Sequence, residues 1–247
     1  MIEHAVVLAA GEGNRLRGLT NGRPKSLFPV AGKPLIDHVL TSLAQAGISE
    51  VVIVLGYQGE EIEGHVGDGR RFALRVRYVW NPYYRLGNAS SFWSALPLVV
   101  GSPFLLAMAD HLCHPDLLRA LLAYVPDRIA IAIDRSTLDP ERTDDATKVE
   151  LRAGSVAGIG KRLVRWDGID TGFSLWPAHV AAGIGIDQSM CGGELAALMA
   201  SLASASGGLA ACDVTGHFWF DVDTEDDIQM AERMMAFEAD EFAPALS

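Results

Sequence analysis

An apolar run that opens directly into a glycine-rich turn constrains this chain most. Residues 6–10 form a short apolar segment of the kind that becomes a buried strand, and Gly11 and Gly13 follow it. Because glycine has no Cβ, the backbone there can approach a ligand closely and direct several N–H groups at an anion. Arg15 and Lys25 add full positive charge, Arg15 as a planar fork and Lys25 as a mobile point charge. This combination predicts a binding site for a nucleoside triphosphate.

Two other phosphate-binding motifs do not fit this turn. A Walker loop has four residues between its first glycine and Gly-Lys-Ser/Thr, and no such string occurs in the sequence. The dinucleotide fingerprint has a third glycine where this chain has Leu16. A tight turn with two solvated cations is the alternative interpretation.

The distribution of charge supports the same site. Residues 1–33 contain five lysines and arginines against two acids, although the whole chain of 247 residues has a net charge of −11. This balance argues against a general nucleic-acid binder, which would normally present a basic face. Such a length is sufficient for one large domain with a sizeable core.

Cysteine usage and hydropathy predict a cytoplasmic protein. Cys113, Cys191 and Cys212 are odd in number and widely spaced, so no disulfide framework is expected. The N-terminal residues show no signal-peptide pattern. The uncharged run 86–109 is interrupted by Pro97 and by the turn residues 101–103, so we expect no membrane span.

Hydrophobic periodicity predicts alternating strands and helices in the first half and a β-rich segment in the second. The fold class expected is α/β, a Rossmann-like and mostly parallel sheet flanked by helices, with a small β-rich insertion for a second substrate. The strands are expected at 6–10, 51–55, 74–80, 104–109, 129–133, 147–151, 155–159, 163–166, 171–176 and within 216–222. The helices are expected at 35–46, 60–66, 88–96, 115–124, 193–203 and 225–239.

Carboxylates follow two of the predicted strands. Asp110 comes after the strand 104–109, and Asp221 and Asp223 close the segment 216–222. Ligands of open α/β sheets bind beyond the carboxyl ends of the strands, where the glycine-rich turn also lies. Mg²⁺ binds to one or two carboxylates together with phosphate oxygens, so these acids are candidate ligands. Capping of a following helix is the alternative role for each of them.

The histidines and the cysteine beside Asp110 do not predict a zinc site. Four candidate ligands within five residues lack the separated pairs from which structural zinc sites are built. His111 is expected to support the site through a hydrogen bond. Cys113 and His114 are expected to be a packing residue and a capping residue.

The turn 81–91 is the candidate for recognition of the nucleotide base. Gly87 would let a flat base approach the backbone, and Asn88 and Ser90 offer donors and acceptors for a base edge or a ribose. A capped helix after a proline turn explains the same residues without a ligand.

The second half supplies the candidates for an acceptor substrate. An acceptor phosphate needs cations, for which Arg135 and Lys148 are favoured; Lys161 is a further candidate that also fits a solvated basic face. Asp170 and Thr171, followed by Gly172, could hold the hydroxyl groups of a polyol.

The residues around the glycine-rich turn resemble the motif of the sugar-phosphate nucleotidyltransferase family. That motif is Ala-Gly-x-Gly-(Thr/Ser)-Arg followed by Pro-Lys, and here Asn14 replaces the hydroxyl residue. Further strings narrow the resemblance to the inositol-1-phosphate cytidylyltransferases, over nearly the whole chain and in the same order. These strings are at 109–111, 134–135, 146–149, 156–161, 170–173 and 220–226.

The resemblance implies one nucleotidyltransferase domain over 1–247, with a nucleotide-binding half at 1–112 and an acceptor-binding half at 113–247. It implies that Arg15 and Lys25 are catalytic residues on the triphosphate, that Asp110 and Asp223 hold Mg²⁺, and that Lys148 lies near the inositol phosphate. The residues of the nucleotide-binding turn would then be Leu8, Ala9, Ala10, Gly11, Glu12, Gly13 and Asn14.

The reaction implied is cytidylyl transfer from CTP to inositol 1-phosphate, giving CDP-inositol and pyrophosphate. The family is often fused to a membrane-embedded phosphatidyltransferase, so a functional link to such an enzyme is expected, and a homodimer is a further expectation. Two alternatives stay open. One is a cytidylyl- or uridylyltransferase for a sugar 1-phosphate or phosphocholine, and the other is a non-catalytic nucleotide-binding regulatory protein.

Overall fold

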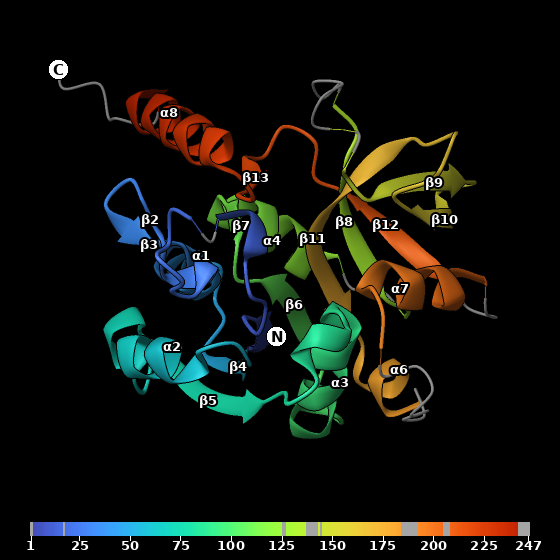
Figure 1. The fold of residues 1–247 in the computed structure, drawn as a ribbon. Helices are drawn as coiled ribbons and strands as arrows, with labels where there is room; N and C mark the ends of the chain where they lie inside the picture. Colours follow the sequence, from blue (N-terminus) through green and yellow to red (C-terminus); the bar gives the residue numbers. More distant parts are fainter. Residues whose placement is uncertain are drawn as a thin grey trace, which may run out of the picture.

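A nine-stranded sheet runs through the centre of the molecule (Figure 1). The computed structural model describes residues 2–16, 18–124, 127–136, 143, 145–183, 192–204 and 208–241, so Cys191 lies outside the described residues. The strands of this sheet are β1 (His4–Leu8), β4 (Glu50–Leu55), β5 (Arg75–Trp80), β6 (Phe104–Met108), β8 (Ala130–Asp134), β9 (Lys148–Arg152), β10 (Ser155–Gly160), β11 (Gly168–Trp176) and β12 (Leu209–Asp213). Their order across the sheet is β5-β4-β1-β6-β11-β8-β12-β10-β9.

The direction of the strands changes at β11. The four strands β5, β4, β1 and β6 are mutually parallel, and β12 is parallel to β8. In contrast, β11 is antiparallel to both of its neighbours, β6 and β8, and the hairpin β9–β10 extends the sheet beyond β12. The parallel part thus comes from the N-terminal half, and β11 joins it to the strands of the C-terminal half.

Helices cover both faces of the sheet because its buried strands are apolar on both sides. Val7 belongs to a core cluster with helices α1, α2 and α4, whereas its neighbour Val6 belongs to a cluster on the opposite face with α3, α6 and α7. This alternation follows from the two-residue period of a strand. The helices are α1 (Leu35–Gln45), α2 (Gly59–Val66), α3 (Asn88–Val99), α4 (Pro115–Ala123), α6 (Ala178–Gly183), α7 (Leu195–Ser204) and α8 (Glu225–Glu241).

A smaller layer lies at the carboxyl end of β6. The short strands β7 (His111–Cys113) and β13 (Trp219–Asp221) pair with each other, and α8 packs nearby in a third core cluster that includes Phe220 and Ile228. A second short pair is β2 (Pro29–Val30) with β3 (Lys33–Pro34), and 3₁₀ turns occur at η1 (Asn14–Leu16), η2 (Lys25–Leu27), η3 (Arg70–Phe72) and η4 (Tyr84–Leu86). Within the residues that the structure describes, no helix combines the length and apolar character that a membrane span requires.

The α/β class and most elements predicted from periodicity are confirmed, but several segments differ. Residues 163–166 are not a strand but an exposed connection between β10 and β11, in which Val164 is 94% exposed. Strand β12, the short strands β2, β3 and β7, and helix α6 were not predicted. Helix α3 extends through Pro97 to Val99, three residues beyond the predicted end, so the proline does not end the helix where we expected.

Candidate active site

The glycine-rich turn is anchored between two parallel strands. Beyond β1, the Ala9 N–H donates to the Val54 carbonyl, and the Ala10 carbonyl accepts from the Tyr57 N–H, both at 3.0 Å. Gly13 has φ +61°, and a Cβ there would lie 2.5 Å from the Cβ of Lys25. The turn therefore needs glycine at this position because the backbone passes directly over the Lys25 side chain.

The Lys25 side chain joins two distant acids. Its Nζ donates to Asp110 Oδ2 at 2.7 Å and to Asp223 Oδ1 at 2.6 Å, and the lysine side chain is only 8% exposed. Burial alone would lower the pKa of Lys25, but Asp110, Asp221 and Asp223 together raise it well above its ordinary value. Lys25 is therefore a permanent cation, held where the ends of β6 and β13 meet the glycine-rich turn.

Helix capping does not account for Asp223. The start of α8 is capped by Thr224 and Asp227: Asp227 Oδ2 accepts from the Thr224 N–H at 2.8 Å, and Thr224 Oγ1 accepts from the Asp227 N–H at 3.2 Å. This reciprocal arrangement is a capping box. The carboxylate of Asp223 instead faces Lys25 and Arg15, whose Nη1 lies 2.8 Å from Asp223 Oδ2.

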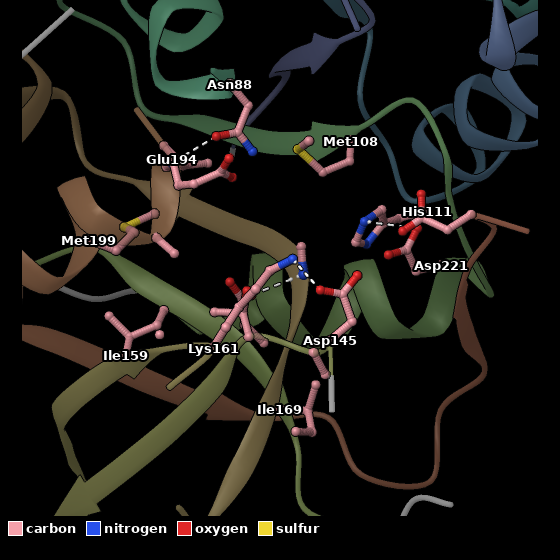
Figure 2. A pocket seen from close by; sticks show the side chains of 18 of the residues that line it. Asn88, Met108, His111, Asp145, Ile159, Lys161, Ile169, Glu194, Met199 and Asp221 are labelled. Carbon is pink, nitrogen blue, oxygen red and sulfur yellow. Dashed lines mark hydrogen bonds and ion pairs between the residues drawn. The ribbon is translucent and has the colours of Figure 1, made fainter. Parts of the chain in front are cut away.

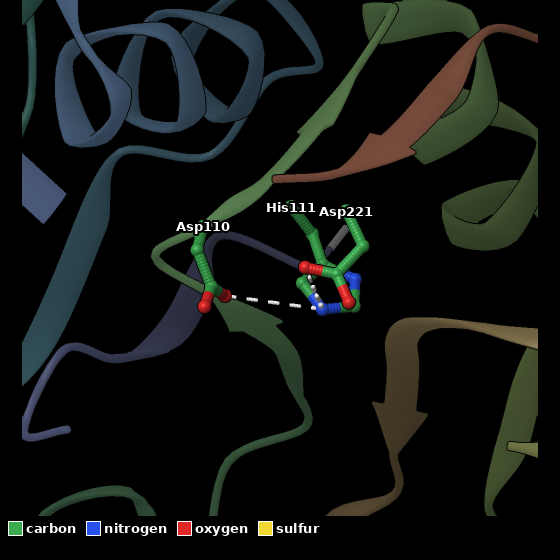
Figure 3. A group of neighbouring side chains, drawn as sticks. All are labelled: Asp110, His111 and Asp221. Carbon is green, nitrogen blue, oxygen red and sulfur yellow. Dashed lines mark ion pairs between the residues drawn. The ribbon is translucent and has the colours of Figure 1, made fainter. Parts of the chain in front are cut away.

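His111 lies between two carboxylates (Figure 3). Its Nδ1 is 2.8 Å from the Thr171 carbonyl, and its Nε2 is 3.5 Å from Asp221 Oδ1 and 3.8 Å from Asp110 Oδ1. Burial alone would lower the pKa of His111, but Asp221 and Asp110 raise it; burial raises the pKa of Asp221 to about 6. The ligand atoms of these three side chains lie within 4.8 Å of one another, an arrangement that could hold a metal ion.

The two neighbours of this cluster have the structural roles that the sequence predicted. Cys113 is buried in the core against α1, where its carbonyl accepts from Ser42 Oγ at 2.7 Å. The Nδ1 of His114 accepts from the Asp116 N–H at 3.3 Å and caps the start of α4. Neither side chain belongs to the metal-ligating group.

A cavity of about 750 Å³ opens beside these charged groups, between the two halves of the chain (Figure 2). Its apolar wall includes Met108, Ile131, Ile159, Ile169 and Met199. The polar residues that line it are Arg15, Asn88, His111, Asp145, Thr147, Lys161, Arg162, Asp170, Ser174, Glu194, Asp221, Asp223, Thr224 and Asp227. A small ligand with a charged end and an apolar ring face fits such a lining.

Two of the predicted acceptor cations lie outside this cavity wall. Arg135 follows the end of β8, where its Nη1 is 3.7 Å from Asp213 Oδ2 and its Nε is 3.4 Å from the Asp167 carbonyl. Lys148 Nζ donates to the Lys161 carbonyl at 3.1 Å and so supports the segment that carries Lys161. Lys161 itself lines the cavity, with its ammonium group pointing into it (Figure 2).

The residues that precede Phe173 have different roles from one another. Asp170 lines the cavity, and its Oδ1 accepts from the Gly172 N–H at 3.0 Å. Thr171 is fully buried, and its Oγ1 donates to the Ala132 carbonyl at 3.0 Å, so its hydroxyl is engaged inside the sheet. Gly172 has φ +82°, and its backbone lies against the ring of His111.

The expected base-recognition turn contacts another part of the chain. A Cβ on Gly87 would lie 2.2 Å from the Gly193 carbonyl oxygen, so the space that its missing side chain leaves is filled by residue 193. Ser90 is buried, and its Oγ lies 2.7 Å from the Gly87 carbonyl oxygen and 3.0 Å from that of Tyr83, within donating distance of either. Asn88 lines the cavity, but its Oδ1 accepts from the Leu195 N–H at the start of α7.

Asp145 and Glu194 are site residues that the sequence did not single out. Asp145 Oδ2 is 2.9 Å from Arg15 Nη1, and its Oδ1 accepts from Lys161 Nζ at 2.8 Å. Glu194 lies opposite, next to Asn88 (Figure 2). Both residues lie in connecting segments, and no motif marks them, so only the folded chain places them at the cavity.

Replacing Gly172 with alanine is expected to destabilise the protein by about 2–4 kcal/mol. A Cβ at this position would lie 2.4 Å from His111 Nδ1, so overpacking adds to the cost of a left-handed conformation for alanine. Gly154→Ala is the matched control, because Gly154 has φ +77° with no atom within 4 Å of its Cβ position. Urea unfolding of the two variants measures the difference. Equal losses of stability would show that the ring of His111 yields to the methyl group at no cost.

Comparisons with known proteins agree with this geometry. The nucleotidyl transferase family matches residues 4–147, and the chain therefore belongs to this family. A bifunctional IPC transferase and DIPP synthase from Rubrobacter xylanophilus is 37% identical over 94% of this chain. The match spans only about half (51%) of that relative's length. An N-acetylmuramate alpha-1-phosphate uridylyltransferase from Neisseria meningitidis serogroup B is 35% identical over 68% of this chain and 79% of that protein.

A solved structure shares the fold. The inositol-1-phosphate CTP transferase from T. maritima superposes with a TM-score of 0.81, covers 98% of each chain and is 24% identical in sequence. The nucleotidyltransferase fold predicted from the motifs is thereby confirmed.

Proposed function

We propose that this chain transfers the cytidylyl group of CTP to inositol 1-phosphate and releases pyrophosphate. The observation that carries the proposal is the position of Lys25, whose ammonium group bridges Asp110 and Asp223 beside Arg15 and the cavity. Nucleotidyl transfer brings several phosphates together, so the site must supply both cations and metal-binding carboxylates. The names of the Rubrobacter relative and of the T. maritima structure support the choice of reaction.

The carboxylates fit a magnesium ion. Asp110 and Asp223 offer hard oxygen donors, and both already bind one cationic group, the ammonium of Lys25. Burial alone would raise the pKa of Asp110, but Lys25 and His111 lower it, so this carboxylate is ionised at neutral pH. We therefore assign Asp110 and Asp223 as the residues that hold Mg²⁺, with His111 and Asp221 beside them. The ion would offset the negative charge of the phosphates.

Positioning and charge neutralisation account for the chemistry without a general base. A phosphate monoester is already largely anionic at neutral pH, so the acceptor can attack the α-phosphorus in line. Lys25 stabilises the charge that builds up on the α-phosphate, and Arg15 holds the β- and γ-phosphates, which become the leaving group. The N–H groups of the turn from Gly11 to Asn14 add further donors to these phosphates.

The acceptor would bind in the cavity with its phosphate towards Lys161. Of the lysines and arginines considered for this role, Lys161 lines the cavity. Lys148 instead contacts the backbone carbonyl of Lys161, and Arg135 contacts Asp213. The hydroxyl groups of the acceptor would face Asp170 and Glu194, and its C–H groups the apolar wall. A cytoplasmic location, a homodimer and a link to a membrane phosphatidyltransferase stay predictions from the sequence.

Replacing Asp170 with asparagine is expected to lower turnover but to stabilise the protein at neutral pH. Burial raises the pKa of Asp170 to about 6, above the value of an unfolded chain, so the folded state retains a proton that the unfolded state releases. Stability that Asp170 contributes near pH 4 is thus lost as pH rises through about 6. Asparagine keeps the acceptor for the Gly172 N–H but carries no charge.

The gain in stability of Asp170→Asn at pH 7.5 should be about 1–2 kcal/mol, and it should vanish near pH 4. Urea unfolding of wild type and variant at both pH values measures it, and pyrophosphate release measures turnover. A variant that is less stable than wild type at pH 7.5 would contradict the account of Asp170 as a strained, functional acid.

Uridylyl transfer to a sugar 1-phosphate is the second candidate, because the Neisseria relative is named for a reaction of that type. Both reactions need the same phosphate contacts and differ in the base and the acceptor. A release assay for pyrophosphate that crosses four nucleoside triphosphates with inositol, choline and sugar phosphates separates them. We expect the highest rate with CTP and inositol 1-phosphate, and no release with any pair would leave a regulatory nucleotide-binding role.

A further inference from the structure

Six charged side chains of the site form one continuous row of alternating sign. Each neighbouring pair is within 2.6–2.9 Å, so every member contacts a partner of the opposite charge. From the cavity to the end of β6, the row is Lys161, Asp145, Arg15, Asp223, Lys25 and Asp110.

Asp145 differs from the other two acids of this row. Asp110 and Asp223 have a role in holding the metal ion, whereas Asp145 has none in the proposed reaction. Its Oδ2 contacts Arg15, the cation for the leaving pyrophosphate, and its Oδ1 contacts Lys161, the cation for the acceptor phosphate. The carboxylate therefore lies between the two cations to which the phosphate groups would bind.

We propose that Asp145 competes with phosphate groups for Arg15 and Lys161 and so weakens the retention of pyrophosphate. Asp145 occupies a donor on Arg15 and a donor on Lys161, so a phosphate oxygen that takes either of these donors must displace the carboxylate. A phosphate that binds through their remaining N–H groups is still repelled by the negative charge of Asp145. This inference rests on the proposed function only in assigning Arg15 and Lys161 to phosphates, and not on the identity of the base or acceptor.

The geometry allows Asp145 to leave and return. Its side chain is 60% exposed, so a displaced carboxylate is hydrated, and its partners Arg15 and Lys161 are 54% and 47% exposed. Ion pairs as exposed as these contribute little each, so together they correspond to roughly a threefold to tenfold change in affinity. A change of this size favours release of the product without preventing the binding of a substrate that makes many other contacts.

Isothermal titration with magnesium pyrophosphate tests the proposal without turnover. We expect Asp145→Asn to bind pyrophosphate roughly threefold to tenfold more tightly than wild type, and the gain to shrink at high salt because the competition is electrostatic. Asp68→Asn is the matched control. It removes the same charge from an exposed acid whose partner is Arg70, and neither residue lines the cavity, so the variant should bind pyrophosphate as wild type does. In product-inhibition assays the inhibition constant for pyrophosphate should fall by the same factor.

Tighter binding of pyrophosphate by Asp145→Asn indicates competition, because a variant with a damaged site would bind it more weakly. A thermal unfolding scan shows whether Asp145→Asn is folded, and Asp145→Ser replaces it if it is not. Unchanged or weaker pyrophosphate binding by the folded variant would overturn the proposal. If wild type itself does not bind pyrophosphate, or if Arg15→Gln binds it equally well, the phosphate site of the proposed function fails instead.

Discussion

Replacing Lys25 with alanine is expected to lower kcat by roughly 10²–10³-fold, the cost of losing one charged donor aimed at the transition state. Lys25 is nearly buried and bridges Asp110 and Asp223, so its ammonium group is held in a fixed position that an alanine side chain cannot reach. Because the variant leaves these carboxylates and Asp221 without their shared cation, Mg²⁺ should raise its melting temperature more than it raises that of wild type. Pyrophosphate release and thermal scans with and without Mg²⁺ measure both effects.

Lys33→Ala is the control for this experiment. Lys33 is an exposed lysine in the same segment, in the short strand β3, so its removal changes the net charge equally. Its kcat should equal that of wild type. Near-normal turnover of Lys25→Ala would remove Lys25 from the mechanism and leave its ion pairs as a purely structural feature.

Replacing either Asp110 or Asp223 with asparagine is expected to lower kcat by about 10²-fold or more, because a neutral amide binds Mg²⁺ poorly and the ion supplies several kcal/mol of charge stabilisation. The loss should shrink as the concentration of Mg²⁺ rises. Asparagine preserves the shape of the side chain, so a large loss of folding is not expected. A titration of pyrophosphate release against Mg²⁺ measures the change in metal requirement.

Asp226→Asn provides the matched comparison for the metal ligands. Asp226 lies three residues after Asp223, in the exposed first turn of α8. This variant should keep the activity and the Mg²⁺ dependence of wild type. If Asp223→Asn behaved in the same way, the metal would have to be held by Asp110 together with His111 and Asp221, whose ligand atoms form the other compact group.

The parts of the fold that could be predicted are the segments whose own hydrophobic pattern indicates a helix or a strand. Helix α1 has a clear 3.6-residue period, and β4 is a continuous apolar run, so both were predicted almost to the residue. Strand β12 has the sequence Leu-Ala-Ala-Cys-Asp, which has weak intrinsic β propensity and becomes a strand by pairing with β8 and β10. Residues 163–166 alternate like a strand, but no neighbouring strand is placed to pair with them among the described pairings.

The site divides in the same way. The nucleotide end rests on motifs, and the structure brings Arg15, Lys25, Asp110 and Asp223 into contact as their positions after strands predict. The acceptor end depends on which of the cations next to β8, β9 and β10 reaches the cavity, and no motif in the sequence indicates that. Arg135 and Lys148 therefore proved to lie outside the cavity wall, while Lys161 lines it.

Strand β11 has a mechanical consequence for how the protein handles its ligands. Its residues 174–176 pair with β6 on one side, and residues 174–175 pair with β8 on the other. The parallel strands and the C-terminal strands therefore belong to one continuous hydrogen-bonded sheet. Rotation of the two halves as rigid bodies would have to break these strand pairings. We therefore expect ligands to enter and leave through local changes at the edge of the cavity, where residues 193–195 contact the turn at Gly87. Amide exchange should then be slow along β11 and faster at this contact.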